Sequence, residues 1–257
     1  MVRRIDAAGT GSYVLSCMER ESLFEKLGYR LGKAAAKARS VFDLVGGDEV
    51  DALVAEVRLG RDLEAAVLER VEMESDNDNT RWLGEIGCQL VAQLRDKHVP
   101  FRFHVTAEQS LNAFAVPGGA VFVSRPLLDL CGGQRDEVGF VLAHEMAHIV
   151  LRHAIARVVE DSLFSLVLRS SPARGAASAW LERVGRQVFS RAFSRDDELE
   201  ADSFALKLVR SSGGDGAAGE NLMEKLARQT PDQGAATLGE YLSTHPPFAE
   251  RIANLRE

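Results

Sequence analysis

The sequence has few cysteines, no long apolar run and no surplus of basic residues. Its three cysteines stand far apart among 257 residues, without a Cys-x-x-Cys pair. This argues against a disulfide framework and against a thiolate metal site. The best apolar run, 163–168, is far too short to cross a bilayer. The formal net charge is −7, which gives no electrostatic basis for binding nucleic acid, so we exclude that class of function.

The first residues bear on location. Val14-Leu15-Ser16-Cys17 is similar to a lipoprotein cleavage box, and Arg3 and Arg4 match a basic leader region. The stretch between them holds Asp6 and several small polar residues, so it lacks the apolar core of a signal peptide. We therefore expect a cytoplasmic protein with no spanning segment. A processed N-terminus would instead make it periplasmic or membrane-associated.

Apolar residues recur every three or four positions over much of the chain, which predicts a mainly helical fold. The polar tract 75–80 is predicted to be a loop. Capping residues sharpen several helix boundaries: Ser194 with Asp197 is typical of a helix start, and Gly132-Gly133 of a helix end. The predicted helical ranges are 19–74 with a break at 46–47, 81–97, a short helix after 124, 136–159, 194–209, 220–228 and 248–256.

One small sheet is expected between these helices. Residues 101–106 alternate apolar and polar, as in a half-buried strand. Two short apolar runs, 111–116 and 120–123, flank Pro117-Gly118-Gly119 and predict a hairpin. The fold class is therefore α+β, mainly helical, with a small antiparallel sheet. We expect residues 1–78 to form a helical extension packed on a catalytic domain of residues 79–257.

The pattern with the clearest chemistry is His144-Glu145-Met146-Ala147-His148. Two histidines four residues apart on a helix point to the same side, so two ring nitrogens can reach one zinc ion. Glu145 is placed to take a proton from water polarised by that ion. A bare His-Glu-x-x-His pattern also occurs by chance, so a third ligand is needed.

The acidic segment 195–202 supplies candidates for this ligand. Glu198 and Asp202 share one helix face, on which Ala201 and Ala205 permit close packing. Glu200 points well away from both. One of the two acids can bind zinc while the other accepts a hydrogen bond from a ligand histidine.

Together these motifs resemble the HtpX/BepA/CAAX-prenyl-protease family of zinc peptidases, in its branch without spanning helices. The resemblance covers about residue 59 to the C-terminus. It is carried by the His-Glu-x-x-His motif and by Leu59-Gly60-Arg61, 112–119, 121–123, Glu198-Leu199-Glu200-Ala201-Asp202, and Thr244-His245-Pro246-Pro247 with Arg251.

The resemblance implies a zincin-like (gluzincin) metalloprotease fold and one Zn²⁺ per chain. It assigns His144, His148 and Glu198 to the metal and Glu145 to the general base. Asp202 would hydrogen-bond His144. His245 would stabilise the oxyanion or bind zinc as a reversible plug.

The same resemblance implies a substrate strand lying along Asn112, Ala113, Phe114 and Ala115. We therefore expect a zinc metalloendopeptidase that cuts unfolded or mislocalised polypeptides. The alternative is a zinc-stabilised, chaperone-like binding module with little turnover. The oligomeric state is not predicted.

Three further residues have plainer interpretations. His153 is five residues beyond His148, so helix geometry turns it away from the metal and predicts packing or surface hydrogen bonding. His104 falls on the polar face of its strand and receives no function. Arg251 either holds the loop that carries His245 or is an exposed helix arginine.

Overall fold

The computed structural model describes residues 49–95, 97–154, 193–229 and 248–256. Three strands form one sheet in the order β1-β3-β2. The strands are β1 (Arg102–Thr106), β2 (Ala113–Val116) and β3 (Ala120–Ser124). Among the described residues, no helix is both long and apolar enough to cross a membrane.

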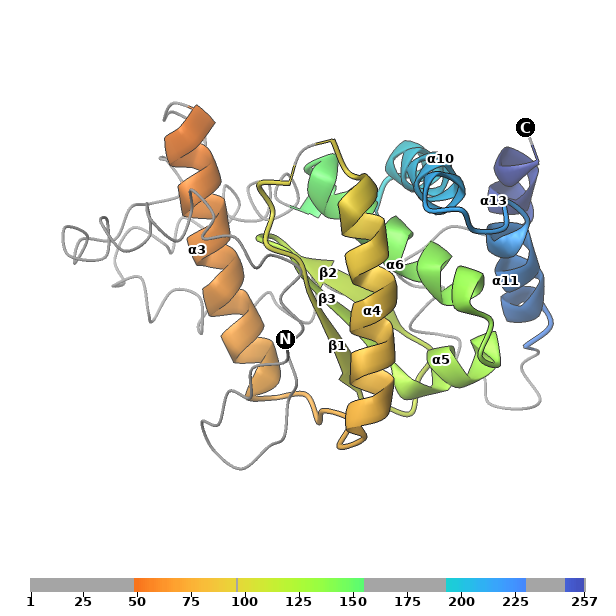
Figure 1. The fold of residues 1–257 in the computed structure, drawn as a ribbon, viewed down its shortest axis with the longest axis horizontal. Helices are drawn as coiled ribbons and strands as arrows, with labels where there is room; N and C mark the ends of the chain where they lie inside the picture. The colour runs from red at the N-terminus through yellow and green to blue at the C-terminus, as the bar shows by residue number, and fades with distance from the viewer. Residues whose placement is uncertain (1–48, 96, 155–192, 230–247, 257) are drawn as a thin grey trace.

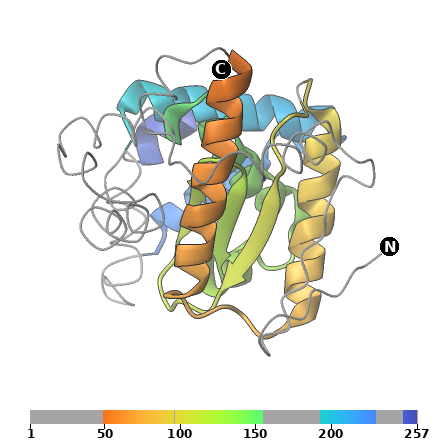
Figure 2. The same ribbon diagram turned by 90° about the vertical axis from the view of Figure 1, so that its left-hand side faces the viewer.

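The helices lie in layers around this sheet (Figures 1 and 2). Helix α3 covers one face, and α4 and α6 cover the other. Helices α10, α11 and α13 lie on the far side of α6. The bounds are α3 Glu49–Leu68, α4 Asn77–Gln93, α5 Arg125–Cys131, α6 Arg135–Val150, α10 Arg195–Ser211, α11 Ala218–Ala227 and α13 Phe248–Leu255.

The predicted hairpin is confirmed, because β2 and β3 pair antiparallel around the turn at 117–119. The sheet as a whole is mixed, however, since β1 pairs with β3 in parallel, and the expectation of an antiparallel sheet is wrong for that pair. After β1 the chain forms β2 at the opposite edge of the sheet, and it then forms β3 in the centre, between β1 and β2. Gly118 and Gly119 allow this tight turn, with φ angles of 82° and 106°.

Helix α3 presses closely on the hairpin turn. A Cβ atom added to Gly60 would lie 2.0 Å from the carbonyl oxygen of Pro117. A buried ion cluster holds the same helix to β1, because the Glu64 carboxylate lies 2.7 Å from Nε of Arg102 and 2.8 Å from Nε2 of His104. The interpretation of His104 as a residue on a polar strand face is therefore wrong. That face is covered by α3, and His104 is 2% exposed.

Helix α6 is buried on every side rather than on one. Each residue from Glu137 to Ile149 is buried, because the sheet, α4, α10 and α11 surround the helix. It also ends at Val150, earlier than the predicted Val159. Polar side chains on such a helix lose their hydration, so they need partners within the protein.

Other boundaries differ for local reasons. Helix α4 begins at Asn77, inside the tract predicted as a loop, because the Asp76 side chain caps it by accepting a hydrogen bond from the backbone N–H of Asp78. The starts of α5 and α10 agree with the prediction, and Ser194 and Asp197 form the expected capping box. Cys131 is buried and free, whereas Cys88 is disulfide-bonded, a bond that the sequence did not predict. Sequence spacing does not report which thiols meet in space.

Candidate metal centre

Three side chains from two helices converge in the middle of the fold. His144 and His148 come from α6, and Glu198 comes from the first turn of α10. All three are almost fully buried, at 3%, 0% and 0% exposed. Glu198 reaches α6 because Ala201 and Ala205 on the same face of α10 are buried, and their methyl side chains are too small to hold the helices apart.

The donor atoms are spaced as a small tetrahedral ion requires. The Nε2 atoms of His144 and His148 are 3.2 Å apart. The two carboxylate oxygens of Glu198 lie 3.4 Å from Nε2 of His144 and 3.5 Å from Nε2 of His148. Ligands at about 2.0–2.1 Å around a tetrahedral zinc would be separated by roughly 3.3–3.4 Å. Two imidazoles and a carboxylate are also a donor set that zinc accepts, so the residues fit the ion.

The ring of His144 is backed by a buried ion pair. Its Nδ1 lies 3.0 Å from Oδ1 of Asp202. Arg251 on α13 donates two hydrogen bonds to the same carboxylate, from Nη2 to Oδ1 at 2.6 Å and from Nε to Oδ2 at 2.8 Å. Arg251 is fully buried, so its interpretation as an exposed helix arginine is wrong. Sequence reasoning had no signal for this contact, since Arg251 and Asp202 are 49 residues apart.

These contacts shift two pKa values. Burial raises the pKa of Asp202, but the charge of Arg251 and its hydrogen bonds outweigh burial and hold that pKa below its usual range. Burial and the Arg251 charge lower the pKa of His144, yet hydrogen bonds to Asp202 and Glu198 raise it overall, to about 9. Without a metal ion this ring therefore carries a proton at neutral pH, which a bound ion would have to displace.

The ring of His148 has different neighbours. The phenyl ring of Phe193 stacks on it, with ring centroids 3.8 Å apart and an interplanar angle of 13°. Its Nδ1 lies 3.2 Å from Nδ1 of His153. His153 thus packs and hydrogen-bonds as predicted, but it does not turn away from His148 as a continued helix would require, because α6 ends before it and the chain bends back.

The remaining predicted residues are placed as follows. Glu145 is 3% exposed and lines one small hollow together with His144 and Ala113 of β2. Asn112 precedes β2, and Phe114 and Ala115 lie within it, at the edge of the described sheet. His245 lies outside the described residues, so its two predicted roles stay predictions.

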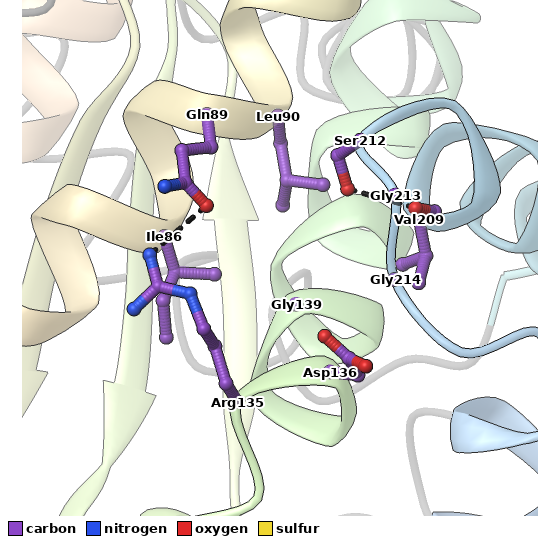
Figure 3. Close-up of a pocket in the computed structure, with 10 residues that line it drawn as sticks. All are labelled: Ile86, Gln89, Leu90, Arg135, Asp136, Gly139, Val209, Ser212, Gly213 and Gly214. Carbon is purple, nitrogen blue, oxygen red and sulfur yellow. Dashed lines mark hydrogen bonds between the residues drawn. The ribbon is translucent and has the colours of Figure 1, made fainter.

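A larger hollow, of about 230 Å³, lies at the other end of α6 (Figure 3). It is lined by Arg135, Asp136 and Gly139 of α6, among other residues, and none of the predicted site residues borders it. Arg135 donates a hydrogen bond to Gln89 across it.

A His-Glu-x-x-His helix with a carboxylate supplied by a second helix is the arrangement of a metallopeptidase. The sequence model of peptidase family M48 matches residues 77–257. The chain belongs to this family, whose members are metal-dependent, and it has the zincin-like metalloprotease fold expected from the sequence.

Relatives agree with this assignment. The beta-barrel assembly-enhancing protease of Yersinia pestis is 31% identical over 189 residues, which are 69% of this chain and 38% of that protein. The mitochondrial metalloendopeptidase OMA1 of Schizosaccharomyces pombe is 32% identical over 190 residues, covering 72% of this chain and 54% of that protein. The chain thus spans between about a third and about half of the length of these relatives.

Proposed function

We propose that the chain is a zinc-dependent metalloendopeptidase that cuts unfolded or mislocalised polypeptides. The observation that carries the proposal is the convergence of His144, His148 and Glu198 within 4.8 Å of one another, beside the buried carboxylate of Glu145. These three residues would hold one zinc ion. When bound, zinc would lower the pKa of a water molecule and polarise the carbonyl group of the scissile peptide.

Glu145 would act as the general base. It follows His144 directly on α6 and is buried beside the proposed metal ligands. Its carboxylate would therefore exchange protons with the attacking water molecule rather than with bulk water. It would take the proton of the attacking water and deliver it to the leaving amine. Asp202, held by Arg251, would keep the Nε2 atom of His144 directed at the metal.

An extended substrate would lie along Asn112–Ala115. Strand β2 is an edge of the described sheet, and Ala113 borders the same hollow as Glu145. A peptide adding to this edge must be extended, because it exchanges main-chain hydrogen bonds with the strand. This requirement favours unfolded segments over folded domains as substrates.

Two broader expectations stay part of the proposal. Residues 79–257 would be the catalytic domain, with residues 1–78 as a helical extension packed on it. The cytoplasm remains the proposed location, although one relative is named as mitochondrial.

The test is cleavage of an unfolded model protein by zinc-loaded wild type and by Glu145→Gln, with the zinc content of both measured. We expect both proteins to hold one zinc and only the wild type to cut. Cleavage by Glu145→Gln would remove Glu145 from the role of base. If the wild type holds zinc without cutting, His245→Ala separates the two explanations: cleavage by this variant would show a plug at His245, and no cleavage would support the chaperone-like alternative. Absence of zinc from both proteins would refute the proposal.

A further inference from the structure

The turn after α6 brings a histidine that is not part of the His-Glu-x-x-His motif against a proposed metal ligand. Helix α6 ends at Val150, and Arg152 has a φ of 65°, the one positive φ outside glycine among the residues that the structure describes. A left-handed conformation is unfavourable for arginine, so the surrounding contacts must hold it. The bend directs His153 back to the side of α6 that carries His148.

The ring nitrogens of His148 and His153 form a consistent chain of hydrogen bonds. Nε2 of His148 faces His144 and Glu198, so a metal ligated there leaves the ring hydrogen on Nδ1. That Nδ1 lies 3.2 Å from Nδ1 of His153, which must then accept the hydrogen bond. The hydrogen of His153 is consequently on its Nε2.

Two carboxylates at the start of α10 favour the same arrangement. Nε2 of His153 lies 3.4 Å from Oε2 of Glu200 and 3.6 Å from Oδ1 of Asp197. Ionised carboxylates only accept hydrogen bonds, so they favour a hydrogen on Nε2 of His153. His153 therefore links α6 to the helix that supplies Glu198. Glu200 has a role here although it points away from the metal itself.

Helix α3 supports this turn from outside the residues that match the family. Nη2 of Arg152 lies 3.0 Å from Oε2 of Glu56, whose side chain is 5% exposed. Glu56 belongs to α3, and the family match begins at residue 77. Burial raises the pKa of Glu56, and the charge of the half-exposed Arg152 lowers it only in part. The contact nevertheless links α3 to the bend that places His153.

We propose that His153 is a positioning residue that fixes the tautomer and orientation of His148, and that Arg152, anchored by Glu56, holds His153 in place. This inference rests on the proposed function, since it assigns a metal to His148. It adds a residue outside the motif and gives α3 a part in building the site.

The test compares zinc affinity, measured by competition with a chelator, in wild type, His153→Leu and His153→Asn. Loss of a partner that orients a ligand histidine lowers metal affinity by about 10- to 100-fold, and we expect this for His153→Leu. In His153→Asn the side-chain oxygen stands where Nδ1 stood and accepts the same hydrogen bond, so most of the affinity should return. His98 is exposed, so His98→Leu serves as the matched control and should bind zinc as the wild type does.

Two further readouts separate positioning from general stability. The visible spectrum of the cobalt-substituted protein should change in His153→Leu and return towards that of the wild type in His153→Asn. Glu56→Gln should lower zinc affinity in the wild type but have little further effect in His153→Leu, because both act through the same contact.

The possible failures are distinguishable. If the wild type binds no zinc, the proposed function is wrong and this inference falls with it. If the wild type binds zinc and His153→Leu binds it equally well, only the positioning role is wrong. The same conclusion follows if His153→Asn, folded by circular dichroism, loses as much affinity as His153→Leu.

Discussion

Replacing Arg251 by Met should destabilise the protein strongly, and more so without metal than with it. Arg251 is fully buried, and its guanidinium group contacts Asp202 through two nitrogens, at 2.6 and 2.8 Å. A third nitrogen lies 3.6 Å from Oε2 of Glu198. Arg251 thus faces two buried carboxylates, which also contact the ring of His144. Met retains an unbranched apolar side chain, which fills the place of the arginine stem, but it provides no charge.

The magnitude follows from the number of charges left behind. Removing one partner of a buried ion pair costs about 3–5 kcal/mol, because the other charge stays in a poorly solvated place. Arg251→Met leaves the carboxylates of Asp202 and Glu198 with the charge of His144 alone, whose pKa is raised to about 9, so we expect the lower part of this range. Domains of ordinary stability have about 5–15 kcal/mol in total, so the metal-free variant should lose a large part of its stability.

A divalent ion at His144, His148 and Glu198 would change this result. Its two positive charges would offset the two carboxylates, so the loss caused by Arg251→Met should be smaller in the zinc-loaded protein. The assay is urea unfolding of both proteins, once with a chelator and once with zinc. Arg256→Met is the control, since Arg256 pairs with Glu220 at the surface and its loss should matter little. A loss below about 1 kcal/mol in the metal-free variant, or an equal loss in both forms, would refute this account of the buried charges.

Two other predictions concern the contact between α3 and the sheet. Gly60→Ala should destabilise by about 1–3 kcal/mol in urea unfolding, although alanine favours helices, because the new Cβ would meet the hairpin carbonyl at 2.0 Å. Gly139→Ala is the control and should stabilise the protein by up to about 1 kcal/mol, since the nearest atom to its new Cβ would be 3.7 Å away. Equal effects of the two substitutions would contradict the close contact at Gly60. Burial raises the pKa of Glu64, but the hydrogen bond from His104 and the charge of Arg102 outweigh burial and hold that pKa below its usual value of 4.5. This carboxylate therefore adds stability above pH 4.5, and that stability is lost as the pH falls through the pKa of the folded state. The wild type should accordingly lose more stability than Glu64→Gln over that range. Parallel profiles of unfolding free energy against pH would show that the cluster contributes nothing.

Some of the site follows from helix geometry alone. The side chains of His144 and His148 must share a side of any helix that contains them, and so must Glu198 and Asp202. The close approach of the two helices was also predictable, because Ala201 leaves no bulk on the shared face. These inferences use spacings of three or four residues, over which the backbone is regular. The structure places those side chains accordingly.

The neighbours of these side chains could not be predicted in the same way. The prediction for His153 assumed that the helix continues past Val150, and a single left-handed residue, Arg152, reverses the outcome. No local pattern marks an arginine for that conformation, since its contact with Glu56 spans almost a hundred residues of sequence. His104 was misplaced for a related reason. Its alternating strand pattern reports one buried face, and only the docking of α3 buries the other.

The two histidines of the motif therefore differ in a way that the motif does not encode. His144 is backed by a charged pair, Asp202 with Arg251, whereas His148 is backed by the rings of His153 and Phe193. A carboxylate makes its imidazole more basic, while an imidazole fixes orientation with less added charge. Two carboxylates backing both rings would add a second buried negative charge, and the described residues at the site offer only Arg251 to compensate it. Because His153 places no carboxylate directly behind His148, it limits the buried negative charge that Arg251 and a bound metal ion would have to balance.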